Sequence, residues 1–158
     1  MQDAGEYYRH ALEGMRSLLD TKLCRDEQRT GCYMAIALAD GRIQVGFNVG
    51  EPPIDKVLRY WRNAGEKAVR LGSHRLAGHT TSRESADIDK EMYPGAIYAP
   101  KTATIFSVSG FHPDADEALA WYTAVAVDDM TIGQAIDEAN RVGNKFAAEW
   151  VRRQFTKF

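Results

Sequence analysis

Cysteine is scarce in this sequence, and the scarcity argues against two classes of small protein. Only two of the 158 residues are cysteines, Cys24 and Cys32. A disulfide framework uses more of them, and a structural zinc site needs further ligands at tight spacing. One hydrophobic core suffices at this length, because domains usually run to about 100–150 residues. We therefore expect a single domain over residues 1–158, with both thiols reduced and packed in its interior.

The sequence also lacks a strong excess of charge and any long apolar run. Its 20 basic residues are balanced by 22 acidic ones, and the densest basic stretch, residues 59–75, is interrupted by Glu66. Nucleic-acid-binding domains are usually basic with clustered Lys and Arg, so we expect no nucleic-acid partner. No apolar run approaches the ~20 residues that span a bilayer, and the first ten residues do not resemble a secretory signal. We expect no membrane partner and a cytoplasmic location.

Most signatures of known chemistry are missing as well. There is no phosphate-binding P-loop, dinucleotide glycine motif, zinc-protease motif, paired C-x-x-C or nucleophile elbow. His74 and His79 are five residues apart, which does not place them on one helix face, so we expect no metal site from this pair. The acidic Asp87, Asp89 and Glu91 alternate in a polar stretch and are interpreted as solvated. The sequence therefore bounds the function without fixing a reaction.

Apolar periodicity predicts an α+β fold. Helices are expected over residues 6–23, 55–71, 114–126 and 131–155, and strands over 32–38, 43–49, 96–98 and 103–108. Asp40-Gly41 between the first two strands is a strong hairpin signal, and Thr131 with Gln134 fits a helix capping box. Hairpin-connected strands imply a central antiparallel sheet flanked by helices. The polar stretch 73–91 is expected to hold one short helix in a long connection, which is often functional.

The most chemical-looking segment is Val108–His112, where a strand turns into a helix. A small-residue turn at Ser109 and Gly110 leaves backbone N–H groups at the helix N-terminus, which favour an anion such as a carboxylate. His112 could donate to, protonate or ligate whatever binds there. The alternative is that Ser109 and Gly110 only make the turn and His112 lies in water. For His74 the corresponding alternative is a cation at a helix C-terminus.

Several short stretches resemble a known family. They are the hairpin Ala35–Ile43, the pair Lys67-Ala68, and Val108–Gly110 followed by Asp114–Ala120. Together they resemble the GlcG/HbpS-type domains, often called haem-degrading domains. The segment from Arg62-Asn63 to Leu71–His74 is similar to a branch of hypothetical proteins in the same superfamily. The corresponding domain also forms the C-terminal part of PduO-type corrinoid adenosyltransferases.

The resemblance covers roughly residues 5–126 and implies a profilin-like α/β/α fold, often assembled into dimers or larger oligomers. Some members bind haem or related tetrapyrroles, and many have no assigned activity. The sequence departs from the family where residues 93–100 replace a glycine-rich hairpin and where an extra C-terminal helix follows from residue 131. Haem ligation varies within the family, so no single histidine inherits that role.

The leading hypothesis is a small-molecule-binding domain, with haem or a related tetrapyrrole as the ligand to test first. Its pocket would lie between the Val108–Gly110 turn, the helix from Asp55 and the loop that carries His74 and His79. An axial ligand would come from one of three histidines, His74, His79 or His112. Propionates would pair with one or more of four arginines, Arg59, Arg70, Arg75 and Arg83.

Two other functions stay open. One is an enzyme acting on a small organic acid in a catabolic pathway, with His112 as acid or base and the Ser109 and Gly110 amides holding a carboxylate or enolate. The other is a non-catalytic sensory or scaffold module. We also expect a homo-oligomer. The apolar stripe of the terminal helix, Phe146, Trp150 and Phe155, is its candidate contact, and ordinary packing of that stripe against the sheet is the alternative.

Overall fold

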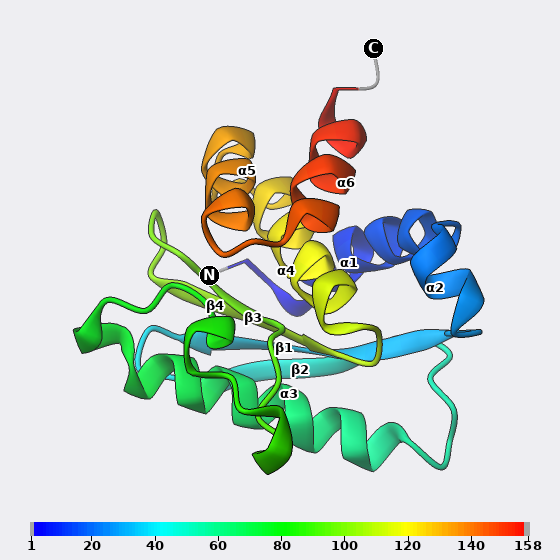
Figure 1. Ribbon diagram of the computed structural model, residues 1–158, viewed down its shortest axis with the longest axis horizontal. Coiled ribbons are helices and arrows are strands. Elements are labelled where there is room, and N and C mark those ends of the chain that lie inside the picture. Colours follow the sequence, from blue (N-terminus) through cyan, green and yellow to red (C-terminus); the bar gives the residue numbers. More distant parts are fainter. Residues whose placement is uncertain (1, 157–158) are drawn as a thin grey trace.

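Four strands form one antiparallel sheet in the computed structural model, which describes residues 2–156. The strands are β1 (Gly31–Leu38), β2 (Ile43–Gly50), β3 (Ala96–Ala99) and β4 (Thr104–Ser109). Their spatial order is β2-β1-β4-β3, so β2 and β3 are the two edges. With helices on both faces of this sheet, the fold is the expected α+β arrangement, and it carries additional helical structure after the sheet (Figure 1).

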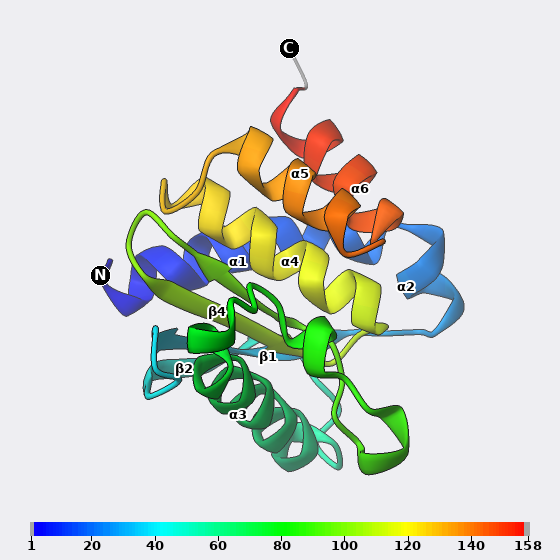
Figure 2. The same ribbon diagram turned by 60° about the vertical axis from the view of Figure 1, so that its left-hand side comes forward.

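The helices divide unequally between the two faces of the sheet. They are α1 (Ala4–Leu19), α2 (Lys22–Asp26), α3 (Val57–Ser73), α4 (Pro113–Ala126), α5 (Ile132–Arg141) and α6 (Lys145–Phe155). Figure 1 shows α3 alone below the sheet and the others above it. In Figure 2, α4 lies next to the sheet and α5 and α6 form a further layer outside it. The extra C-terminal helices therefore pack over α4, on the side of the sheet opposite α3.

The predicted hairpin is confirmed. β1 and β2 pair antiparallel from Gly31–Gly50 to Ala37–Ile43. Between them Gly41 has φ of +91°, a left-handed conformation that glycine adopts without a steric penalty. The Leu38 N–H donates to the Arg42 carbonyl at 3.0 Å and closes the turn.

Two predicted helices are interrupted, for local reasons. The helix expected over residues 6–23 ends at Leu19, and α2 follows after a short turn. The helix expected over 131–155 is two helices, because Gly143 takes φ of +82° and the Asn144 side chain caps α6 by accepting from the Ala147 N–H at 2.9 Å. The Thr131–Gln134 capping box is confirmed at the start of α5. The 73–91 connection holds three short 3-10 turns in place of one helix.

The two faces of the sheet have different cores. Toward α1 and α4 lies a large apolar cluster that includes Tyr7, Phe106 and Trp121. Toward α3 the cluster is small, with Ala37, Ala68, Leu71, Ala96 and Ile105 as its buried members. Small side chains let α3 lie close to the sheet, so a polar side chain of α3 can reach the end of β4. Both cysteines are buried free thiols, as expected.

The apolar stripe of the terminal helix packs inside the molecule. Trp150 is buried, and Phe155 stacks on Tyr122 of α4 with ring centroids 5.1 Å apart. Phe146 also packs against the large cluster. This stripe is therefore used within the chain, on α4 rather than on the sheet. Among residues 2–156 no helix is long and apolar enough to cross a membrane.

Candidate functional site

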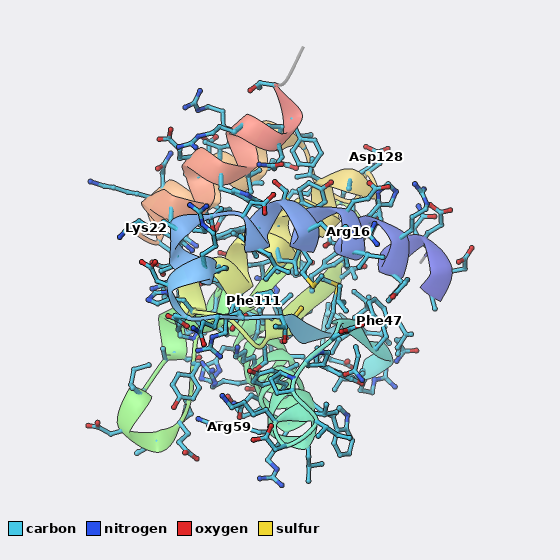
Figure 3. The ribbon with its side chains drawn as sticks, turned by 90° about the vertical axis from the view of Figure 1, so that its right-hand side faces the viewer. Arg16, Lys22, Phe47, Arg59, Phe111 and Asp128 are labelled. Carbon is cyan, nitrogen blue, oxygen red and sulfur yellow. The ribbon has the colours of Figure 1, made fainter. Side chains whose placement is uncertain are left out.

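A cavity of about 260 Å³ lies where the turn after β4 meets the first half of α3. Four of the predicted site residues, Ser109, Gly110, His112 and Arg59, line it together. Figure 3 looks at this end of the molecule, with Phe111 at the level of the sheet and Arg59 below it. Four basic side chains and two carboxylates line the cavity: Arg29, Lys56, Arg59 and Lys67 against Glu27 and Asp116. The cavity is therefore cationic on balance.

Lys67 lies in the deepest part of this site. Its residue is only 2% exposed, on the side of α3 that faces the sheet. The ammonium donates to the Val108 carbonyl at 2.7 Å and to Asp116 Oδ2 at 3.2 Å. An ammonium has three N–H donors, and no residue in the described part of the chain accepts from the third. A buried cation that lines a cavity with one unused donor is suited to hold an anion.

Asp116 balances the charge of Lys67 from the first turn of α4. Its Oδ1 accepts from the Phe111 N–H at 2.9 Å, and the residue is 2% exposed. Burial raises the pKa of Asp116 to about 6, although Lys67 and the Phe111 N–H favour its ionised form. The carboxyl is therefore ionised at neutral pH and gains a proton in mildly acidic solution.

The rim of the cavity combines one fixed arginine with two unpaired cations. Arg29 forms an ion pair with Glu27 at 2.6 Å and donates to the Gly110 carbonyl at 3.1 Å. Arg59 and Lys56 are exposed and have no ion-pair or hydrogen-bond partner among residues 2–156. The planar guanidinium of Arg59 can bind a carboxylate through two parallel hydrogen bonds. The rim thus offers a free bidentate donor next to the buried ammonium.

His112 is held in one tautomer by the helix that it caps. Its Nδ1 accepts from the Asp114 N–H at 3.1 Å, so the neutral ring carries its proton on Nε2. No residue in the described chain pairs with Nε2. In this state His112 is a hydrogen-bond donor at the edge of the cavity and has no free nitrogen lone pair with which to act as a base.

The backbone amides expected to bind an anion are partly occupied already. The Phe111 N–H donates to Asp116, and the Asp114 N–H donates to His112. Gly110 has φ of +147°, and a Cβ at this position would lie 2.7 Å from the Cα of Cys32. Gly110 is therefore required to pass the chain over β1. The side chains of Lys67 and Arg59, more than free amides, give the cavity its positive charge.

Arg70, a predicted propionate partner, is buried elsewhere on α3. It binds Glu66 through two hydrogen bonds, of 2.7 and 3.0 Å. It also donates to the Ser82 carbonyl, the Ser85 hydroxyl and the Tyr93 carbonyl. All of its donor nitrogens are paired within the chain, so the side chain fastens the 82–93 loop to α3 and has no donor left for a ligand.

Arg83 is also paired internally. It contacts Asp114 at 2.5 Å and the fully buried Glu117 at 2.7 Å. Burial raises the pKa of Glu117, and the Arg83 guanidinium and the Asn144 amide oppose that rise. This cluster joins the 82–93 loop to α4 and to the start of α6. Arg83 does not line the cavity.

His74, His79 and Arg75 gather beyond the far end of α3. The two imidazole rings stack with centroids 4.9 Å apart, and His74 Nδ1 lies 2.7 Å from the Arg70 carbonyl. The Arg75 guanidinium lies 3.5 Å above the centre of the Tyr98 ring and donates to the His79 carbonyl. None of the three lines the cavity, so the structure separates them from Ser109, Gly110 and His112.

Lys67 and Asp116 are the site residues that patterns of charge missed. Neither was predicted as a site residue, because lysine usually lies on the exposed side of a helix and acidic residues are common in its first turn. Their signal is that Lys67 falls between Ala64 and Leu71 on the buried side of α3. Asp116 lies between the buried residues Ala115 and Ala118 of α4, which is the same kind of signal. Both residues lie in stretches that resemble the family, and the resemblance implies no role for either.

No family model matches the sequence, and no curated protein matches it. One solved structure that is similar is a crystal structure titled as a PduOC–haem complex, with 17% sequence identity and a TM-score of 0.42. The similarity covers 79% of this chain and 94% of that one.

Proposed function

We propose that this protein binds a small organic anion, with the carboxylate of the ligand held between Lys67 and Arg59. The observation that supports this most directly is the unused donor of the buried Lys67 ammonium. A lysine this deeply buried is expensive unless its charge is neutralised and its donors are paired. Asp116 neutralises it in part, and a ligand carboxylate would complete its hydrogen bonds.

The size of the cavity favours a small acid. At about 260 Å³ it lies just below the roughly 300–1,000 Å³ of pockets that enclose drug-sized ligands. It has room for a carboxylate with a few further atoms. A tetrapyrrole could place a propionate there, with its ring outside the cavity. A small acid and a tetrapyrrole would thus both bind through a carboxylate.

The histidines do not combine with this cavity into a haem pocket. An imidazole that ligates a metal through one nitrogen usually donates the N–H of the other. His112 shows the opposite arrangement, because its Nδ1 accepts from the helix. His74 has the suitable arrangement, with Nδ1 directed at the Arg70 carbonyl, but it lies beyond the other end of α3.

A second candidate is the enzyme acting on a small organic acid. The fixed tautomer of His112 leaves its Nε2–H free to donate a hydrogen bond. That donor could polarise a carbonyl or enolate oxygen of the bound acid. In this form His112 stabilises developing negative charge and does not abstract the proton. A His112→Ala variant that kept full turnover of an identified substrate would contradict this role.

Two titrations of the purified protein separate the ligand sources. The first follows haemin by visible absorption, and the second follows a panel of small hydroxy, keto and dicarboxylic acids by calorimetry. We expect saturable binding of at least one small acid at one site per chain. We also expect Arg59→Ala to weaken it by about tenfold or more, the loss of a charged hydrogen bond.

The matched control is Arg16→Ala on α1. Arg16 is exposed, has no partner among the described residues and lies away from the cavity. It should bind the acid as the unmodified protein does. Haemin binding that displaces the acid and is weakened by Arg59→Ala would assign the carboxylate to a propionate. Absence of binding by every acid and by haemin, or equal binding by the Arg59→Ala variant, would overturn the proposal.

A further inference from the structure

The rest of the chain covers one edge strand of the sheet, β3, and leaves the other, β2, open. The β3 edge is covered by the segment before it. The Tyr98 N–H donates to the Thr80 carbonyl at 2.9 Å, Thr81 bridges to Ile97, and the Ala96 N–H donates to the Ser82 hydroxyl. In the part of the chain that the structure describes, β2 pairs with β1 alone. Its outer edge has no strand beside it.

The open edge has one protective feature, a bulge where Ile36 pairs with Val45 and Ala37 with Ile43, and lacks the others. Natural edge strands carry charged residues or proline, or they are kept short, because a free strand edge readily pairs with another strand. The eight residues of β2, Ile43–Gly50, contain no charged residue and no proline. Figure 3 labels Phe47 of this strand on the side of the sheet opposite the 82–93 loop. β2 is therefore a long, uncharged and open edge.

An apolar stripe on α3 runs beside this edge. Leu58, Trp61 and Val69 are 56%, 53% and 55% exposed, and their helical spacing places them on one side of α3 with Gly65 between them. A Cβ at Gly65 would lie 3.5 Å from Ile43 Cδ1, so the stripe borders the first residue of β2. Leu58 and Trp61 also line a shallow hollow of about 640 Å³ together with Asn48 of β2.

We propose that this surface, the β2 edge with the Leu58–Trp61–Val69 stripe, binds a second copy of this chain. Two β2 strands would pair antiparallel about a two-fold axis, and the two α3 helices would cross beside them. A two-fold interface brings the same patch of both copies together, so the patch must complement itself. The residues of α3 meet this condition about an axis that passes near Asn63 and Ala64.

The complementarity has a steric part and a charged part. About that axis Trp61 of one copy faces Gly65 of the other, where there is no side chain, and Leu58 faces Val69. Arg62 is exposed and has no partner among residues 2–156. It would face Glu66 of the second copy, whose side chain remains 36% exposed although it pairs with Arg70. Opposite charges would thus meet next to the apolar contacts.

A second copy covers this surface better than an extended peptide would. A peptide can pair with the β2 edge, but it leaves the α3 stripe in water. A copy of this chain presents a strand edge and an apolar helix side in the same relative position. An eight-residue strand and a 17-residue helix are each about 26 Å long, so the two parts of the surface match in length.

The test is the oligomeric state of the full chain in sedimentation velocity over about a hundredfold dilution range. We expect a dimer that dissociates on dilution. We also expect Trp61→Glu to raise its dissociation constant by about 30-fold or more, as for a central interface residue. Trp121 and Trp150 are buried and Trp61 is half-exposed, so association should shift tryptophan emission to the blue through Trp61.

The control is Ile88→Glu, which introduces the same charge at an apolar residue of similar exposure, 57%, in the 82–93 loop. It should leave the dissociation constant within about twofold, as surface positions outside an interface do. Circular dichroism establishes that both variants are folded. A chain that is monomeric at every concentration, or a dimer unaffected by Trp61→Glu, would overturn the proposal. Neither result bears on the carboxylate cavity, because Trp61 does not line it.

Discussion

The two ends of α3 carry the same kinds of side chain and use them in opposite ways. Around the cavity, Arg59 and Lys56 at the start of α3 have no side-chain partner among the described residues, and Lys67, past the middle of the helix, keeps one donor unused. Near its end, every donor nitrogen of Arg70 is paired, and Arg75 lies on an aromatic ring. A cation is a candidate for ligand binding when its donors lack partners within the fold. Residue type and helix position alone do not reveal this.

Lys67→Met tests the cavity side of α3 and should have the largest effect. The substitution leaves the Asp116 carboxylate buried beside one amide N–H. Breaking a buried ion pair in this way costs about 3–5 kcal/mol of unfolding free energy. We expect that loss in urea denaturation at neutral pH, together with loss of anion binding. The double variant Lys67→Met/Asp116→Asn should recover much of the stability and none of the binding.

Recovery of binding in that double variant would contradict the role of Lys67. It would show that the anion is held by the rim alone, by Arg59 or Arg29. An unchanged free energy of unfolding in the single variant would contradict the buried ion pair itself.

Arg70→Met tests the other end of α3 and should affect stability rather than anion binding. It removes a buried guanidinium that joins Glu66, two loop carbonyls and a hydroxyl. Leaving these acceptors without a partner should cost about 3 kcal/mol or more. The 82–93 loop should also become accessible to protease. Arg16→Met is the matched control and should change the free energy of unfolding by less than about 0.5 kcal/mol. An equally stable Arg70→Met variant would show that the arginine is not needed to fasten the loop.

The pH dependence of binding tests the coupling between Asp116 and the anion. The pKa of Asp116 is raised by burial to about 6, above the roughly 3.9 of a free aspartate. The folded chain therefore holds this proton more tightly than the unfolded chain does, and its contribution to stability falls as the pH rises from about 4 to about 6. Protonation also removes the negative charge beside Lys67.

We therefore expect anion affinity to rise by roughly tenfold as the pH falls through 6, since a nearby repelling charge is lost. The charged or titratable groups that face Asp116 are Lys67, Arg29, Cys32 and Cys24. Calorimetry across this range should show the slope in the unmodified chain and in His112→Asn, but not in Asp116→Asn. A slope that persists in Asp116→Asn would assign it to another group.

The fold could be predicted from the sequence wherever a local signal sufficed. The Asp40-Gly41 turn, the Thr131 cap and the alternating strand β2 each depend on neighbours in the chain. The break at Gly143 was missed because a glycine inside a periodic pattern has two readings, and only the cap made by Asn144 chooses between them. The proposed extent of the single domain, residues 1–158, stays a prediction.

The candidate site could be predicted only in part, because it depends on distant pairings. The turn at Ser109, Gly110 and His112 was found from local pattern, and Arg59 from its charge. Lys67 and Asp116 are 49 residues apart and meet only because α3 and α4 lie at the same end of β4. The arginines were predicted as one set, whereas the fold buries Arg70 and Arg83 in ion pairs. Pairings of this kind depend on the register of the whole sheet.

The histidines give the smallest expected effect and sharpen the contrast between the two ends of α3. His112→Asn keeps a residue that caps helices well but removes the Nε2–H donor. The loss of one hydrogen bond to an anion should weaken binding by roughly fivefold. His74→Ala and His79→Ala should leave the dissociation constant of a small acid within about twofold, because both rings lie outside the cavity. Calorimetry of the three variants measures the difference directly. If His74→Ala or His79→Ala weakened the small acid more than His112→Asn, the ligand would lie at the far end of α3, and the division between its free and occupied cations would be wrong.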